Sequence, residues 1–321
     1  MPGLRVHRTE HTAVVAAPAR VLYDLVADVT RWPAVFGPSV HVRHIEKSDR
    51  AERFRLWAVV GDEVRNWTSR RTLDPDTLRV TFAQDHSRPP IASMGGEWLF
   101  RELPDGRTEV VLVHEFQAVD DTADNIAWIN AGLDRNSPKE LAALTRIAEL
   151  GHPVDDVVFA FEDVIDMPGA AADAYEFIDR ADLWPEILPH VGKVDLTEPE
   201  PGVQRLRMET VTKDGSAHTT ESIRLCFPGE RIVYKQTAAP ALLFGHSGSW
   251  TFSEDELGAH VTARHTVVLN PAALKEALGP DSTLADARAY ITQALGANSR
   301  ATLAHAAAHA AAHTEARRAA S

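Results

Sequence analysis

Each half of this sequence carries one arginine and one histidine within stretches of alternating apolar residues, namely Arg71 and His114, then Arg224 and His265. Alternate residues of a strand point to the same face, so these side chains are predicted to lie on the inward, apolar faces of strands. A buried guanidinium is costly unless it meets a carboxylate, a hydrated cavity or an anionic ligand. These residues are therefore candidates for a binding or catalytic cavity.

Other polar and aromatic side chains share the same inward faces. They are Ser69, Trp67, Met94 and Trp98 in the first half, and Ser222, His246 and Trp250 in the second. Asn136 and Asn298 each interrupt the apolar stripe of a long predicted helix that ends a half. Each half thus brings an arginine, a histidine, an asparagine, a serine and a tryptophan toward one cavity. The structural alternatives are an ion-paired arginine, a hydrogen-bonded core histidine and an asparagine that only caps a helix.

The two halves are an internal repeat. Trp32-Pro33 recurs 152 residues later as Trp184-Pro185, and the segment 96–100 (GEWLF) matches 248–252 (GSWTF) at the same spacing. Such a period is far longer than that of a solenoid repeat, so the chain is predicted to hold two whole domains, residues 1–151 and 152–321. The boundary is placed where a helical pattern gives way to turn residues.

Both domains show the same order of elements. A strand comes first, a helix opens after Pro18 or Pro168, several period-2 strands follow, and one long helix ends the domain. This order predicts an α+β fold of two tandem helix-grip domains. In each, a curved antiparallel sheet wraps a long C-terminal helix and leaves an internal cavity.

Composition excludes several classes of protein. The 321 residues carry 33 Lys and Arg against 46 Asp and Glu, a net charge of −13, which argues against nucleic acid and anionic membranes as partners. Cys226 is the single cysteine, so no intramolecular disulfide or cysteine-rich metal site is possible. No apolar run approaches the ~18 residues of a spanning helix, and the polar start is unlike a signal peptide. A cytoplasmic protein is expected.

Three histidines near the end of the chain have a spacing that metal ligands use. His305, His309 and His313 follow one another at four-residue intervals in an alanine-rich helix. No neighbouring carboxylate or cysteine in the sequence completes a site, so we expect a solvated helix and no metal. Phosphate-binding glycine loops and zinc-protease motifs are also missing, which predicts an activity without a cofactor.

The segment 67–74 (WTSRRTLD), the segment 32–36 (WPAVF) and Asn136-Ser137 resemble the bacterial polyketide aromatase/cyclases of the START/Bet v 1-like superfamily. Two such domains in tandem resemble the didomain members found in type II polyketide synthases of actinomycetes. The resemblance implies an enzyme that acts on a poly-β-ketone bound to an acyl carrier protein, among other synthase components. It would direct the first-ring aldol cyclisation of a ketoreduced chain, from carbon 7 to carbon 12, and then dehydrate the ring to an aromatic one.

The resemblance also assigns roles to residues. Arg71 would stabilise enolate and alkoxide charge with Ser69 beside it, and His114 would move protons, because an imidazole titrates near working pH. Their counterparts Arg224, Ser222 and His265 are the catalytic candidates of the second domain. Substrate would lie against residues of both domains: Phe36, Trp67, Met94, Trp98 and Asn136 in the first, and His246, Trp250 and Asn298 in the second.

Some positions depart from the family pattern. A tyrosine of some single-domain relatives is Ser39 here, and the second domain has Thr220 and His246 in place of Trp67 and Met94. The second cavity is therefore predicted to be the more polar one. The main alternative is a non-catalytic helix-grip carrier of a lipid or aromatic ligand, and a third is a scaffolding subunit of the synthase.

Overall fold

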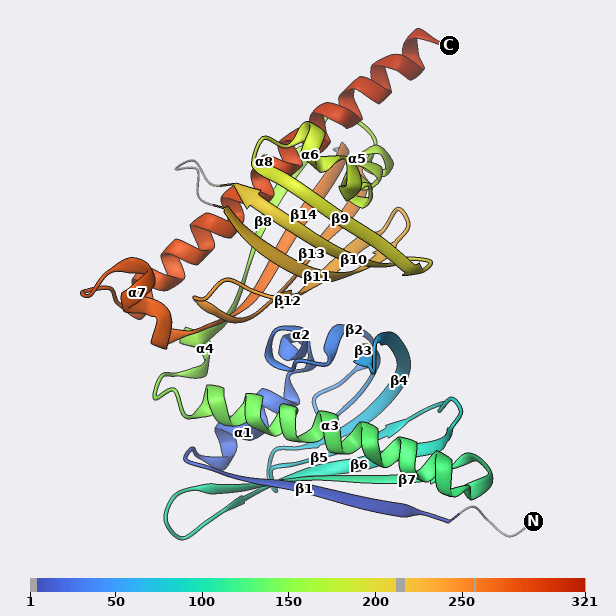
Figure 1. The fold of residues 1–321 in the computed structure, drawn as a ribbon, viewed down its shortest axis with the longest axis vertical. Helices are drawn as coiled ribbons and strands as arrows, with labels where there is room; N and C mark the ends of the chain where they lie inside the picture. Colours follow the sequence, from blue (N-terminus) through green and yellow to red (C-terminus); the bar gives the residue numbers. More distant parts are fainter. Residues whose placement is uncertain (1–4, 212–216, 257, 321) are drawn as a thin grey trace. The chain divides into compact units, whose positions relative to one another are not determined.

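In the computed structural model, which describes residues 5–211, 217–256 and 258–320, each half of the chain folds around its own sheet. The chain divides into two units, Met1–Val154 and Asp155–Ser321. Both units follow the same succession of elements, which Figure 1 shows from blue to red. The predicted α+β architecture of two tandem sheet-and-helix units is confirmed.

The first unit contains seven strands and three α-helices, with short 3-10 turns at Val29–Arg31 and Val119–Asp121. In chain order they are β1 (His7–Val15), α1 (Ala19–Ala27), α2 (Trp32–Val35), β2 (Ser39–Lys47), β3 (Ala51–Val60), β4 (Glu63–Asp74), β5 (Arg79–Gln84), β6 (Ile91–Glu102), β7 (Thr108–Ala118) and α3 (Ala123–Ala148). Pro18 precedes α1, and the Thr122 side chain caps α3 by accepting from the Asn125 N–H.

The second unit repeats this plan and has short 3-10 turns at Ala181–Leu183 and Pro271–Ala273. Its elements are α4 (Val154–Val157), β8 (Val158–Met167), α5 (Ala171–Asp179), α6 (Trp184–Ile187), β9 (Val191–Glu200), β10 (Val203–Val211), β11 (Ala217–Phe227), β12 (Arg231–Ala238), β13 (Leu243–Asp255), β14 (Gly258–Leu269), α7 (Leu274–Leu278) and α8 (Leu284–Ala319). Thr283 and Asp286 form a capping box at the start of α8.

The strand order is the same in both sheets. It is β1-β7-β6-β5-β4-β3-β2 in the first and β8-β14-β13-β12-β11-β10-β9 in the second, with every pair antiparallel. The first strand of each unit thus pairs with the last one, and the rest follow in chain order. In Figure 1 α3 lies across the first sheet and α8 across the second. None of the helices in the described part of the chain has the length and apolar character needed to cross a membrane.

Candidate functional site

The first unit encloses a cavity of about 230 Å³ between its sheet and α3. Two apolar clusters border it. One contains Phe54 and Leu56 with Trp32 and Trp67, and the other contains Met94 and Ile129. Every site residue that the sequence suggested for this half lines the cavity: Phe36, Trp67, Ser69, Arg71, Met94, Trp98, His114 and Asn136. Strand alternation and the helix stripe predicted the inward position of these residues except Phe36, which the family resemblance supplied.

Arg71 is buried and its donors are already engaged. Its Nε donates to Glu52 Oε1 at 2.7 Å, Nη1 donates to the Val26 carbonyl at 2.8 Å, and Nη2 donates to the Ala27 carbonyl at 2.7 Å. The guanidinium also lies 4.9 Å from the centre of the Trp32 ring. Burial lowers the pKa of Arg71, and the charge of Glu52 opposes that shift.

These contacts agree with the alternative in which Arg71 is ion-paired, and its role in stabilising enolate charge stays a prediction. The guanidinium ties the C-terminal end of α1, whose last carbonyls carry partial negative charge, to β4 and to Glu52 on β3. Glu52 Oε2 also lies 2.8 Å from His44 Nε2, so both carboxylate oxygens have partners. Arg71 is thus a fixed part of the cavity wall, as the ion-pair alternative describes.

Unlike Arg71, His114 has a polar side-chain atom without a hydrogen-bond partner among the described residues. Its ring stands edge-on to Phe82, with the ring centres 5.4 Å apart, and Nδ1 is buried with no hydrogen-bond partner among the described residues. Burial lowers the pKa of His114 to about 4, with the charge of His11 as a smaller cause. His114 is therefore neutral at pH 7, which corrects the expectation of an imidazole that titrates near working pH.

The group with a pKa near neutral pH on the cavity wall is Glu140, for which the sequence patterns predicted no role. Its carboxyl lies on the cavity wall, on the same face of α3 as Asn136 and Leu133. Burial alone raises its pKa to about 7, since no described residue pairs with the carboxylate. The sequence does contain a signal for this residue, because a glutamate within an apolar helix stripe is costly to bury and is a candidate for function.

In the second unit, the arginine that corresponds to Arg71 has no carboxylate opposite it. Arg224 faces Gln204 across the strand pair β10–β11, where the first unit places Arg71 opposite Glu52. Only 1% of Arg224 is exposed, and it donates from Nη2 to the Ile178 carbonyl. Its Nε and Nη1 have no partner among the described residues. Burial lowers the pKa of Arg224, while nearby groups, with Cys226 and Asp179 foremost, oppose this.

An arginine that is buried without a carboxylate should cost stability. We expect Arg224→Met, which keeps most of the side-chain volume, to leave the free energy of unfolding of the second unit unchanged or to raise it by about 1–3 kcal/mol. Chemical denaturation measures this, with Arg207→Met on the exposed face of the neighbouring strand as the control. A loss of stability of several kcal/mol would show that Arg224 is a structural anchor.

Both ring nitrogens of His265 have hydrogen-bond partners in the second unit. Its Nε2 lies 2.8 Å from Ser299 Oγ, and its Nδ1 lies 2.9 Å from the Tyr234 hydroxyl and 3.0 Å from His246 Nε2. All four side chains are buried. Burial lowers the pKa of His265 to about 4, and that of His246 well below its usual value. The prediction of a more polar interior in this unit agrees with these contacts.

The placement of Asn298 was predicted incorrectly. Asn298 is exposed, and the next residue, Ser299, is the one that faces the sheet and contacts His265. The reason is that α8 is rich in alanine, so few large apolar residues mark which of its faces is buried. Of the other second-unit candidates, Trp250 packs on Tyr234 with ring centres 4.8 Å apart, and Ser222 is partly buried on β11.

Thr302 takes the place of Glu140 in the second unit, since each stands three residues after the buried serine of its helix. The Thr302 hydroxyl donates to the Asn298 carbonyl of its own helix. The second unit therefore offers neither a carboxyl with a raised pKa at this position nor an imidazole with a free Nδ1 at His265.

Two family models match the chain. Both describe polyketide cyclase/dehydrase and lipid transport proteins, one over residues 15–134 and the other over residues 158–310. Each match therefore falls within one of the two sheet-and-helix units.

Full-length relatives are similar to the whole chain. The granaticin polyketide synthase bifunctional cyclase/dehydratase of Streptomyces violaceoruber is 55% identical over 96% of this chain and 95% of its own length. The actinorhodin polyketide synthase bifunctional cyclase/dehydratase of Streptomyces coelicolor is 57% identical over 94% and 96%. Among solved structures, the di-domain ARO/CYC BexL of the BE-7585A pathway is 47% identical, covers 95% of this chain and 98% of its own, and has a TM-score of 0.81. StfQ of the steffimycin pathway is 40% identical, covers 96% and 99%, and has a TM-score of 0.80.

Proposed function

Because this chain belongs to the didomain polyketide cyclase/dehydratase family, we propose that it cyclises and dehydrates a poly-β-ketone, and that the chemistry takes place in the cavity of its first unit. The substrate is a ketoreduced chain on an acyl carrier protein, and the first ring closes between carbons 7 and 12. The observation that carries the proposal is a single apolar cavity lined by both a carboxyl whose pKa is about 7 and an imidazole with a free Nδ1.

Cyclisation needs a base that is ionised part of the time at neutral pH. The ionised form of Glu140 takes a proton from the methylene between two ketones, which is already acidic, and the resulting enolate carbon attacks the target ketone carbon. Protonated Glu140 then returns this proton to the new alkoxide. A pKa near 7 suits this step, because the base is strong enough to react yet ionised in about half of the molecules.

Dehydration uses the opposite form of the same group. Protonated Glu140 gives its proton to the leaving hydroxyl, the carboxylate that results accepts the second α-proton, and water departs as the double bond forms. Neutral His114 orients the carbonyl or the hydroxyl through its free Nδ1. Aldol addition and loss of water leave the net oxidation state of the substrate unchanged, so no oxidant or reductant is consumed.

The cavity walls fold the flexible chain so that one pair of carbons meets. Trp67, Met94, Trp98 and Phe36 supply apolar surface, and Asn136 supplies an amide for a carbonyl. Orientation of this kind contributes roughly 7–11 kcal/mol in favourable cases. Arg71, with Ser69 on the same strand face, keeps the wall and the end of α1 in place and adds positive potential near the developing oxyanion.

The second unit is proposed to act on a later intermediate or to hold the chain. The unpartnered Nε and Nη1 of Arg224 support this role, because buried donors without partners are suited to a carbonyl oxygen. A carrier without turnover is the second candidate for this unit, favoured by the engagement of both ring nitrogens of His265.

Reconstitution with a minimal type II synthase and its ketoreductase tests the proposal. We expect His114→Ala to lower the yield of the cyclised aromatic product by at least tenfold. Shunt products, in which the polyketide chain has cyclised at other positions, should rise. His265→Ala should leave first-ring closure intact. Circular dichroism confirms folding in each case. Unchanged product from His114→Ala, or loss of first-ring closure only in His265→Ala, would place the chemistry elsewhere.

A further inference from the structure

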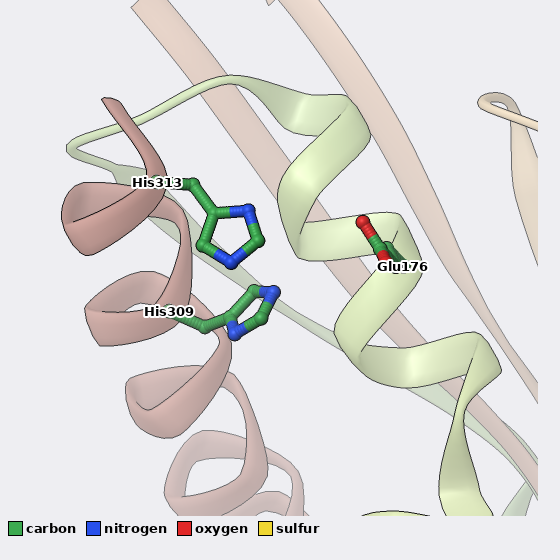
Figure 2. A group of neighbouring side chains, drawn as sticks. All are labelled: Glu176, His309 and His313. Atoms are coloured by element: carbon green, nitrogen blue, oxygen red, sulfur yellow. The ribbon is translucent and has the colours of Figure 1, made fainter. Parts of the chain in front are cut away.

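Two histidines of α8 and one glutamate of α5 meet at a point away from the sheet-facing sites. His309 and His313 are one helical turn apart, and both imidazoles project toward α5, where Glu176 lies (Figure 2). One potential ligand atom from each residue lies within 4.8 Å of the other two. Glu176 comes from a segment more than 130 residues earlier, so only the fold supplies the carboxylate that the histidine spacing lacks.

Two further contacts indicate a binding site rather than a solvated cluster. The Nε2 atom of His309 is buried and has no hydrogen-bond partner among the described residues. The Nδ1 atom of His313 lies 3.7 Å from Asp173 Oδ1, which leaves Nε2 for a ligand. Histidines that bind metals commonly direct their second nitrogen to a carboxylate in this way.

We propose that Glu176, His309 and His313 bind a zinc ion. Two imidazoles separated by one helical turn, with a carboxylate from a second helix, form a donor set that suits Zn²⁺, and a water completes the tetrahedron. Ligand bonds of about 2.0–2.2 Å require the three groups to close inward, and the exposed Glu176 side chain is free of the packing that would prevent this.

The ion would fasten the C-terminal turns of α8 to α5. At present Asp173 makes the charged contact between these helices, through a hydrogen-bonded ion pair with Arg317 at 2.9 Å. Arg180 adds positive charge near Glu176, but it is engaged by Asp182 at 2.8 and 2.9 Å. Zinc would add a second link one turn earlier on α8, independent of the cavity of the first unit.

Zinc titration of tag-free, full-length protein tests the site, with a chromophoric chelator as competitor. We expect one Zn²⁺ per chain, and a rise in the melting temperature of the second unit of about 5 °C or more at saturating zinc. Glu176→Gln, His309→Ala and His313→Ala should each weaken binding by about 100-fold or more, since changes to supporting groups alone cost 10–100-fold. These substitutions are at partly exposed positions of α5 and α8 and should not impair folding.

His305→Ala is the matched control, because His305 lies on the same helix, one turn before His309, and is not part of the group. It should bind zinc as the wild type does. The proposal is overturned if the wild type binds zinc no better than a His309→Ala/His313→Ala double variant. It is also overturned if His305→Ala loses as much affinity as His309→Ala, because binding would then belong to the histidine-rich helix in general.

Discussion

Replacing Glu140 by glutamine is expected to slow formation of the cyclised product by about 10²–10⁴-fold, the usual contribution of a positioned general acid or base. Glutamine keeps the size and polarity of the side chain but has no proton to exchange. The wild-type pH profile should show an inflection near 7 that belongs to Glu140, and this inflection should vanish in the variant. Single-turnover assays from pH 5.5 to 8.5 measure both effects.

The stability of the same variant supplies an independent check. Because burial raises the folded-state pKa of Glu140 above its ordinary value of 4.5, ionisation disfavours the folded state as pH rises from about 4.5 through 7. Glu140→Gln removes this effect, so the variant should gain stability over the wild type at pH 8 but not at pH 4. Glu115→Gln, on the exposed side of the strand that carries His114, should change neither activity nor this pH dependence. A fully active Glu140→Gln enzyme would refute the assignment.

Glu52→Gln should cost the first unit about 3–5 kcal/mol of unfolding free energy, because it leaves a buried guanidinium without its counter-charge. Only 1% of the Arg71 side chain and 2% of the Glu52 side chain are exposed, so water cannot take over. Arg71 also holds the end of α1, and loss of the pair should loosen that helix. Denaturant unfolding monitored by tryptophan fluorescence is suitable, since Trp32 stacks on the guanidinium.

The control for Glu52→Gln is an exposed pair on the adjacent strand. Glu63→Gln removes a contact to Arg65 at 3.1 Å in which both side chains face solvent, and such pairs contribute less than about 1 kcal/mol. A Glu52→Leu/Arg71→Met double variant should recover part of the loss, because neither charge is then left alone. Equal small effects of Glu52→Gln and Glu63→Gln would mean that the buried pair is not important for stability.

The fold could be predicted because its signals are periodic and occur twice. Alternation over residues 12–17 and 164–167, each followed by a proline and a helical pattern, predicts a strand and a helix without any tertiary information, and the observed strands are the longer His7–Val15 and Val158–Met167. The repeat of Trp-Pro and of the GEWLF and GSWTF segments indicates two copies of one domain. Asn298 was misplaced by one residue because few large apolar residues mark the buried face of this alanine-rich helix.

The residues that line the first cavity were also predictable, but their ion pairing and their protonation states were not. Alternation shows that Arg71 points inward, yet its partner Glu52 is 19 residues away and is identified only by strand register. For a related reason, the proposed acid–base role of Glu140 was not predicted. The titration behaviour of Glu140 and His114 depends on how much water the surrounding side chains exclude, and that is a property of three-dimensional packing.

The aromatic residue next to the cavity histidine differs between the units by one oxygen atom: it is Phe82 beside His114 and Tyr234 beside His265. Phe82 and Tyr234 hold the same register position opposite Arg71 and Arg224, and the Tyr234 hydroxyl reaches His265 past Gly248, which has no side chain to block it. Where the oxygen is present, Nδ1 of His265 has a hydrogen-bond partner, and where it is missing, Nδ1 of His114 has none among the described residues. After a gene duplication, one phenol can thus change the hydrogen bonding of a buried histidine while the scaffold around it is preserved.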